Sequence, residues 1–164
     1  MTEPSMRLIS FRGDAGEQLV DPASAAVAMQ DDFHRLEREV EQALIDLLQR
    51  RQLASAGLVV AFDAGTATVT LAGPVADQIL REKIILSCGN VQGVCQVVDL
   101  LDAPLSMRTR RSRLYTVQAG DTLASIAVCV YGDASQYRRI FEANQPMLSD
   151  PAQVYPGLTL RLPA

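Results

Sequence analysis

The sequence predicts an α+β fold made of two small modules, with the element order αββαβ in residues 31–104 and βααβ in residues 114–164. Three observations support this prediction. An amphipathic helical pattern opens the first module, two strand-like runs joined by a short turn follow it, and two more strand-like runs enclose a helical stretch near the C-terminus. Residues 1–30 then form a leader and residues 105–113 a linker. A chain of 164 residues has room for two such modules.

In the first module, apolar residues recur at steps of three and four along a helix, and Asp31 and Asp32 are placed to cap its start. The segment Asp63-Ala64-Gly65 predicts a hairpin turn between two strands, and Gly73-Pro74 is expected to end the second of them. Another helix and a third strand follow. The expected elements are a helix over residues 31–51, strands over 58–62 and 66–71, a helix ending at the loop 89–93, and a strand over 94–101.

In the second module, each strand-like run lies beside a turn signal. Residues 114–117 precede Ala119-Gly120-Asp121, and residues 158–162 follow Tyr155-Pro156-Gly157. Proline followed by glycine at the two central positions is typical of a type II turn. Asp121 is expected to cap the first helix of this module.

Charge is divided unevenly between the two parts of the chain. Residues 1–104 carry eight Lys and Arg against fifteen Asp and Glu, whereas residues 105–164 carry seven Arg against four acids. The acidic first part argues against nucleic acid and against an anionic membrane surface as partners. The one basic cluster, in residues 108–113, lacks interleaved aromatic residues and is interpreted as a solvated linker.

The three cysteines, Cys88, Cys95 and Cys129, form no C-x-x-C pair and lie among apolar neighbours. We therefore expect buried, reduced thiols rather than a zinc site or disulfides. The N-terminus has no signal-peptide pattern, and the sequence has no apolar run long enough to span a membrane, so a cytoplasmic protein without membrane insertion is expected. The only histidine, His34, lies on a charged helix face, and no nucleophile–base set or carboxylate dyad is recognisable, so we expect no enzyme.

Residues 114–163 resemble a LysM module, a small βααβ unit best known for binding glycans rich in N-acetylglucosamine. The αββαβ order, with a Thr-Val-Thr-Leu-x-Gly strand exit, resembles a BON domain, a small non-catalytic fold. The pairing in one chain resembles the cytoplasmic BON–LysM potassium-binding proteins of bacteria. Three stretches strengthen this resemblance: Phe11-Arg-Gly-Asp-Ala-Gly-Glu-Gln-Leu19, the segment from Glu82-Lys-Ile84 to Gly89-Asn-Val-Gln-Gly-Val94, and Ile140-Phe-Glu-Ala-Asn-Gln-Pro-Met-Leu148.

The resemblance implies a bound K⁺, or Rb⁺, Cs⁺ or NH₄⁺ in its place, and no organic cofactor. A K⁺ site needs several neutral oxygens, and a helix C-terminus supplies carbonyls that carry partial negative charge. Two glycines, Gly89 and Gly93, would let the loop after the helix curl. Two other interpretations remain open: an ordinary helix cap, or a carboxylate site for calcium at Asp14 and Glu17. The implied ligands are the backbone carbonyls of Arg12, Ala15, Glu17, Gly89, Val91 and Val94.

The resemblance to sugar-binding LysM modules implies a shallow groove between two loops. Its residues would be Gly120, Asp121, Thr122, Leu123, Asn144, Gln145, Pro146 and Met147. The plainer interpretation is that Asp121 caps a helix, that Pro146 and Leu148 pack, and that the aromatic residues Tyr131, Tyr137, Phe141 and Tyr155 build a core.

From this we expect a monomeric cytoplasmic K⁺ sensor or buffer that becomes compact on ion binding, as its first module closes against LysM. The LysM module could in addition bind a glycan or a protein partner, and the sequence leaves this question open. The alternative is a peptidoglycan-binding LysM protein associated with the cell envelope.

Overall fold

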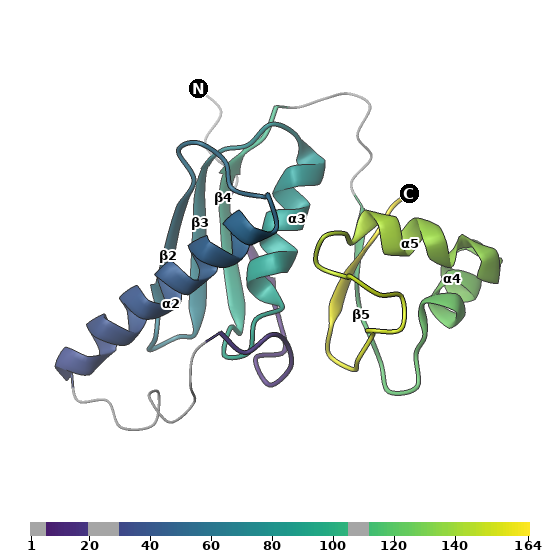
Figure 1. The fold of residues 1–164 in the computed structure, drawn as a ribbon, viewed down its shortest axis with the longest axis horizontal. Coiled ribbons are helices and arrows are strands. Elements are labelled where there is room, and N and C mark those ends of the chain that lie inside the picture. Colours follow the sequence, from purple (N-terminus) through teal and green to yellow (C-terminus); the bar gives the residue numbers. More distant parts are fainter. Residues whose placement is uncertain (1–5, 20–29, 105–111) are drawn as a thin grey trace.

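The computed structural model describes residues 6–19, 30–104 and 112–164. We call the described residues up to 104 the first module and residues 112–164 the second module. The two lie side by side, with α3 facing the second module (Figure 1). The first module contains β1 (Arg7–Ser10), α2 (Gln30–Arg50), β2 (Val59–Asp63), β3 (Thr68–Pro74), α3 (Gln78–Gly89) and β4 (Gln96–Asp102). The second contains β5 (Arg113–Thr116), α4 (Leu123–Tyr131), the 3₁₀ helix η1 (Ala134–Gln136), α5 (Tyr137–Ala143) and β6 (Thr159–Leu162).

The predicted α+β fold class is confirmed, and the element orders αββαβ and βααβ are both present. Strand β1, which precedes the αββαβ elements in the sequence, was not predicted. Arg113 lies in β5 rather than in a linker, and the rest of the basic cluster, up to residue 111, lies outside the described residues. The side chains of Asp31 and Asp32, expected to cap α2, are also outside what the structure describes.

The first module has a four-stranded mixed sheet in the order β1-β4-β3-β2. β3 and β4 are parallel, and α3 forms the crossover between them; β1 and β2 pair antiparallel at the two edges. β1 joins the sheet through β4, so that Ser10 lies opposite Gln96. This pairing anchors the chain directly before the leader residues of interest.

Helices α2 and α3 cover one face of this sheet and bury an aliphatic core (Figure 1). α2 contributes Leu44 and Leu48, which are almost completely buried, as the steps of three and four predict. Because a strand alternates its side chains, β3 directs Val69 and Leu71 into the same core. The predicted hairpin between β2 and β3 is confirmed, although its loop extends to Ala67, which has φ +52°.

The second strand ends at Gly73-Pro74, as predicted, although it includes both residues. Pro74, the last residue of β3, lies opposite Asp102 of β4. The missing N–H of proline is tolerated because this part of β3 extends beyond its pairing with β2. Gly73 adopts φ +120°, and a Cβ there would lie 2.3 Å from the Gly57 carbonyl oxygen. The close approach therefore requires glycine.

In the second module, β5 and β6 form an antiparallel pair over which α4 and α5 pack. The turn Tyr155-Pro156-Gly157 has the predicted chemistry: the Leu158 N–H donates to the Tyr155 carbonyl, and Gly157 has φ +93°. The corresponding turn before α4 has Gly120 at φ +87°. The glycines of the two turns therefore have similar positive φ angles.

Asp121 does not cap α4, contrary to the sequence prediction. Thr122 is the N-cap and forms a reciprocal capping box with Ser125. Asp121 instead accepts hydrogen bonds from the Gln118 N–H and the Tyr115 hydroxyl at 2.9 and 2.7 Å. Its carboxylate thus fastens the turn to β5.

The expectation of three buried thiols holds only for Cys88. Burial raises the pKa of Cys88 to about 12. Cys95 and Cys129 are exposed, because Cys95 lies in the loop before β4 and Cys129 is on the outer face of α4. All three are free thiols.

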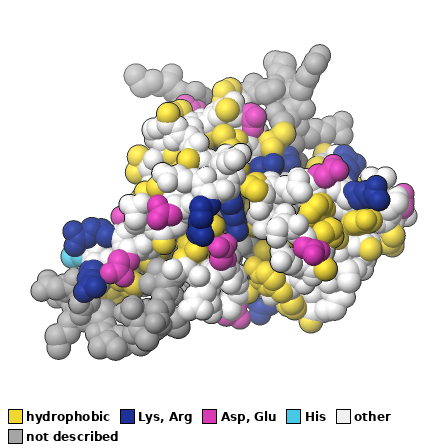
Figure 2. Space-filling model, in the orientation of Figure 1, with side chains coloured by type: hydrophobic (Ala, Val, Ile, Leu, Met, Phe, Trp, Pro, Cys, Tyr) yellow, Lys and Arg dark blue, Asp and Glu magenta, His cyan; other side chains and the backbone are white. Residues whose placement is uncertain are grey.

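Most of the aromatic residues of the second module pack as expected, since Tyr131, Tyr137 and Phe141 lie against its core. Tyr155 is 37% exposed and lies on the side facing the first module. On the face shown in Figure 2, acidic and basic side chains are interspersed rather than gathered by sign. This face therefore offers no basic patch of the kind that tracks a phosphate backbone.

Candidate functional site

The leader runs from β1 along the loop that follows α3, and backbone hydrogen bonds join the two segments. The Phe11 N–H donates to the Cys95 carbonyl at 2.8 Å, and the Gly93 N–H donates to the Gly13 carbonyl at 2.8 Å. Further along, Glu17 and Val91 form a parallel bridge. All six residues whose carbonyls were expected to bind an ion lie in these two paired segments.

The six carbonyls fall into two groups of three. Those of Arg12, Glu17 and Val91 each accept one backbone hydrogen bond, from Ala15, Gln92 and Val94 respectively. The other three belong to Ala15, Gly89 and Val94, and in the turns and loops of the described residues no backbone N–H donates to them. A carbonyl oxygen has two lone pairs, so even the bonded ones keep capacity for another partner.

Helix α3 ends at this loop. Gly89 is its last residue, and Asn90 is the C-cap, whose N–H donates to the Leu86 carbonyl. The last carbonyls of a helix carry partial negative charge, which favours a cation at this end. The loop thus brings dipolar oxygens to the negative end of a helix.

The glycines of the site act in two ways. Gly93 has φ +93°, as a curled loop requires, but Gly89 is helical, which corrects the idea that both glycines curl the loop. Gly89 is needed for space, because a Cβ there would lie 2.1 Å from the Phe11 ring. Gly16, which the sequence analysis did not single out, has φ +128°, and a Cβ there would lie 2.0 Å from the Asn90 carbonyl oxygen.

The carboxylates near the site both face arginines. Asp14 lies 3.8 Å from the Arg12 guanidinium, and both side chains are well exposed. Glu17 pairs with Arg51 at 2.7 Å, which ties the leader to the end of α2. Burial lowers the pKa of Arg51, and the negative charge of Glu17 opposes that shift. Among the described residues, no group of three or more His, Cys, Asp or Glu could hold a metal ion.

The second module contacts both segments of the candidate site. Asn90 binds the backbone of Thr159 in β6, with its Nδ2 2.8 Å from the carbonyl oxygen and its Oδ1 2.7 Å from the amide nitrogen. On the leader side, Gly157 lies so close to Ala15 that a Cβ would be 2.9 Å from the Ala15 Cβ. A cavity of about 470 Å³, lined by residues of both modules including Tyr155, lies next to these contacts.

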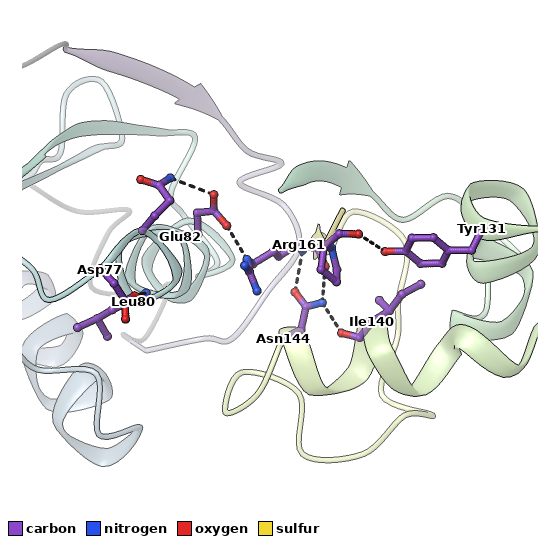
Figure 3. A network of polar contacts seen from close by, with 9 residues as sticks. Asp77, Leu80, Glu82, Tyr131, Ile140, Asn144 and Arg161 are labelled. Atoms are coloured by element: carbon purple, nitrogen blue, oxygen red, sulfur yellow. Dashed lines mark hydrogen bonds and ion pairs between the residues drawn. The ribbon is translucent and has the colours of Figure 1, made fainter. Parts of the chain in front are cut away.

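A buried ion pair joins the modules further along α3. Glu82 and Arg161 lie 2.5 Å apart with side chains only 10% and 8% exposed, and Gln78 also donates to Glu82 (Figure 3). Glu82 comes from the acidic module and Arg161 from the basic one. Glu82 begins one of the stretches that carry the family resemblance, but the sequence analysis paired neither residue with a partner. The charge asymmetry of the two parts was the only signal for this pairing.

The residues expected to line a glycan groove are divided by the fold. Leu123 is buried, whereas Gly120, Asp121 and Thr122 lie at the turn before α4. The remaining residues form the loop that lies against α3. The cavity left at this contact is only about 10 Å³ and is lined by Lys83, Leu86, Ser87, Ala143, Asn144, Gln145, Pro146 and Met147. One side of the expected groove is therefore covered by the first module.

Two side chains that could take part in acid–base chemistry, those of His34 and Asp99, are held by partners in the fold. His34 is exposed and pairs with Glu37 one helical turn away, at 3.1 Å. Asp99 is buried in a salt bridge with Arg81 at 2.8 Å. Each group thus has a structural partner. No helix among residues 6–19, 30–104 and 112–164 is both long and apolar enough to cross a membrane.

The fold and the paired carbonyl-bearing segments define a two-module α+β protein, and residues 115–163 match the family model described as "LysM domain". The potassium binding protein Kbp of Escherichia coli O6:H1 is 35% identical to this chain over 158 residues, which cover 96% of this chain and 99% of that protein. The chain therefore belongs to the same family as Kbp. An uncharacterized protein of Deinococcus radiodurans is 42% identical over 50 residues, or 30% of this chain and 19% of that protein.

Proposed function

We propose that this chain binds K⁺ through the backbone carbonyls of Arg12, Ala15, Glu17, Gly89, Val91 and Val94. The observation that carries the proposal is the pairing of the leader with the loop after α3, which gathers carbonyls at the negative end of a helix. The name of the Kbp relative supports the same ion.

The chemistry of the site favours a large monovalent cation over Ca²⁺ or Mg²⁺. K⁺ is held in proteins by neutral carbonyl oxygens, whereas the divalent ions are usually bound through carboxylates. Here the carboxylates of Asp14 and Glu17 are paired with arginines. Rb⁺, Cs⁺ and NH₄⁺ would enter the same site because it recognises the ion by oxygen dipoles.

The test is a comparison of thermal melts in KCl and in NaCl, followed by calorimetric titration in a buffer free of both ions. A ligand bound only by the folded state adds stability by mass action, so K⁺ raises the melting temperature more than Na⁺ does. Equal shifts in the two salts would reduce the effect to ionic strength and remove the proposal.

Two glycines give a matched pair for the same test. Gly16→Ala places a Cβ 2.0 Å from the Asn90 carbonyl and separates the leader from the loop, so K⁺ binding is lost. Gly93→Ala also strains a positive φ but has no atom within 4 Å of the added Cβ, so it weakens binding less. Equal effects would show that backbone strain, rather than the pairing of the segments, controls the site.

We place this activity in the cytoplasm, in a monomeric, non-catalytic sensor or buffer whose modules pack more tightly when the ion binds. Cell fractionation tests the location, and small-angle scattering with and without K⁺ tests the mass and the compaction. A protein found only in the envelope fraction would contradict the proposal.

Glycan binding is a second candidate, favoured by the LysM match. Against it stands the loop from Asn144 to Met147, which lies on α3 in this structure. Binding of N-acetylglucosamine oligomers would therefore require the modules to separate. Titration with such oligomers, and isolation of the protein with the cell envelope, would support this candidate.

A further inference from the structure

Asn90 lies between two of the proposed ligand residues, Gly89 and Val91, and connects three parts of the molecule. Its N–H donates to Leu86 of α3, and its carbonyl accepts from the Glu17 N–H of the leader, each at 3.0 Å. Its side chain makes the two hydrogen bonds to Thr159 of the second module. The residue is only 7% exposed. A shift of this backbone therefore disturbs the site and the module contact together.

The side-chain contact has a defined geometry. The planar amide of Asn90 occupies one edge of β6 as a neighbouring strand would, donating to the Thr159 carbonyl and accepting from its N–H. Both bonds go to one residue of β6, Thr159, and so they set the position of this strand relative to the loop. The contact of Gly157 with Ala15 fixes the leader from the same module. The second module thus holds both segments that carry the proposed ligands.

We propose that Asn90 is a positioning residue of the ion site, which couples the docking of β6 to the spacing of the Gly89 and Val91 carbonyls. This inference rests on the proposed K⁺ function. Because coupling between two binding events is reciprocal, docking strengthens ion binding by the same factor as the ion strengthens docking. Asn90 needs no contact with the ion for this role.

The first experiment compares Asn90→Ala with Asn144→Ala in the full chain. Asn144 makes the same two bonds to Arg161 of β6, but from within the second module. By calorimetry, Asn90→Ala raises the dissociation constant for K⁺ about 10-fold, within the usual range of coupling between sites. Asn144→Ala leaves this constant close to that of the parent protein at temperatures where both modules are folded, although it lowers the stability of the second module.

A second pair of variants separates contact from backbone strain. Gly157→Ala and Gly120→Ala strain similar turns, at φ +93° and +87°. Only the Cβ at position 157 meets the leader, at 2.9 Å from Ala15, whereas position 120 has nothing within 4 Å. Gly157→Ala therefore weakens K⁺ binding and increases the radius of gyration in KCl, while Gly120→Ala does neither. This pair keeps the inference testable if Asn90→Ala does not fold.

The outcomes separate this inference from the proposed function. If the parent protein shows no preference for K⁺ over Na⁺, the K⁺ function fails and the coupling fails with it. If K⁺ binds but neither Asn90→Ala nor Gly157→Ala changes its dissociation constant, the coupling alone is wrong. An equal loss of affinity in Asn144→Ala and Asn90→Ala would also overturn it, because general loosening of β6 would then explain both.

Discussion

Asn90 and Asn144 bind the same edge of β6 from opposite sides of the boundary between the modules. Both cap the C-terminus of a helix, and each donates to a β6 carbonyl and accepts from the N–H of the same residue, Thr159 for Asn90 and Arg161 for Asn144. β5 occupies the other edge of β6. The strand therefore needs both asparagines to pair its backbone. Asn144 belongs to the same module as β6 and can always form its bonds, whereas Asn90 forms its bonds only when the two modules dock.

Two neighbouring residues of α3 show the same difference between a contact within one module and a contact between the two modules, here with ion pairs. Arg81 pairs with Asp99 inside the first module, whereas Glu82 pairs with Arg161 across the boundary. Removing one partner of a buried ion pair leaves the other charge unpaired. The resulting loss of folding free energy depends on whether water can reach that charge. Inside the first module the Asp99 side chain is 2% exposed and that of Arg81 17%, so full hydration of this pair requires unfolding. Between modules, separation is enough to hydrate both groups.

The largest effect is expected from Asp99→Asn, which leaves Arg81 without a charged partner inside the first module. The free energy of unfolding of that module falls by about 3–5 kcal/mol. Urea unfolding followed by far-UV circular dichroism measures this loss. Arg35→Ala, which breaks an exposed ion pair with Glu39, serves as the control and costs less than about 1 kcal/mol. A similar loss in both variants would contradict the importance of burial.

The second-largest loss of stability is expected from Asn144→Ala. It leaves the buried N–H and C=O of Arg161 unpaired and also removes a bond to the Ile140 carbonyl. The second module loses about 2 kcal/mol of stability. Tyrosine fluorescence measures this module selectively, because all four tyrosines lie in it and the chain has no tryptophan. An unchanged unfolding midpoint would show that water replaces the asparagine.

A smaller effect is expected from Glu82→Gln. The modules separate more often and Arg161 becomes hydrated, so each module keeps its stability to within about 1 kcal/mol. The docked fraction falls, and small-angle scattering in KCl shows a larger radius of gyration. A loss of stability as large as that of Asp99→Asn would mean that the two modules unfold as one unit.

The smallest effect concerns pH and a contact wholly within the second module. The hydrogen bond from the Tyr115 hydroxyl, followed by that from the Gln118 N–H, lowers the pKa of Asp121. The pKa of Asp121 is therefore lower in the folded state than the value of about 3.9 in the unfolded state. The ionised carboxylate stabilises the fold above that pH, and this stability is lost as the pH falls through the pKa of the folded state. Asp121→Asn therefore reduces the pH dependence of tyrosine-monitored unfolding below about pH 4. An unchanged pH profile would show that this carboxylate contributes nothing.

Within the candidate site, the sequence indicated the two segments that pair but not the contacts that fix them. The loop after α3 was recognisable from its glycines, and the positive φ of Gly93 agrees with the expected curl of the loop. The role of Gly89 was mistaken, because its constraint comes from Phe11, far away in the chain. Gly16 and Asn90 were not singled out, since the partners that explain them are visible only in the fold.

The sequence by itself determined the features that depend on a few neighbouring residues. These are the order of helices and strands, the amphipathic face of α2, and the turn at Pro156-Gly157, where local backbone preferences decide the outcome. Tertiary structure decided the features that depend on distant partners. Thr122 rather than Asp121 caps α4 because Tyr115 of β5 draws the carboxylate away. Asn90 and Thr159 are 69 residues apart, and Glu82 and Arg161 are 79 apart. No local pattern encodes such pairs, because their energy exists only once the two modules are folded and docked.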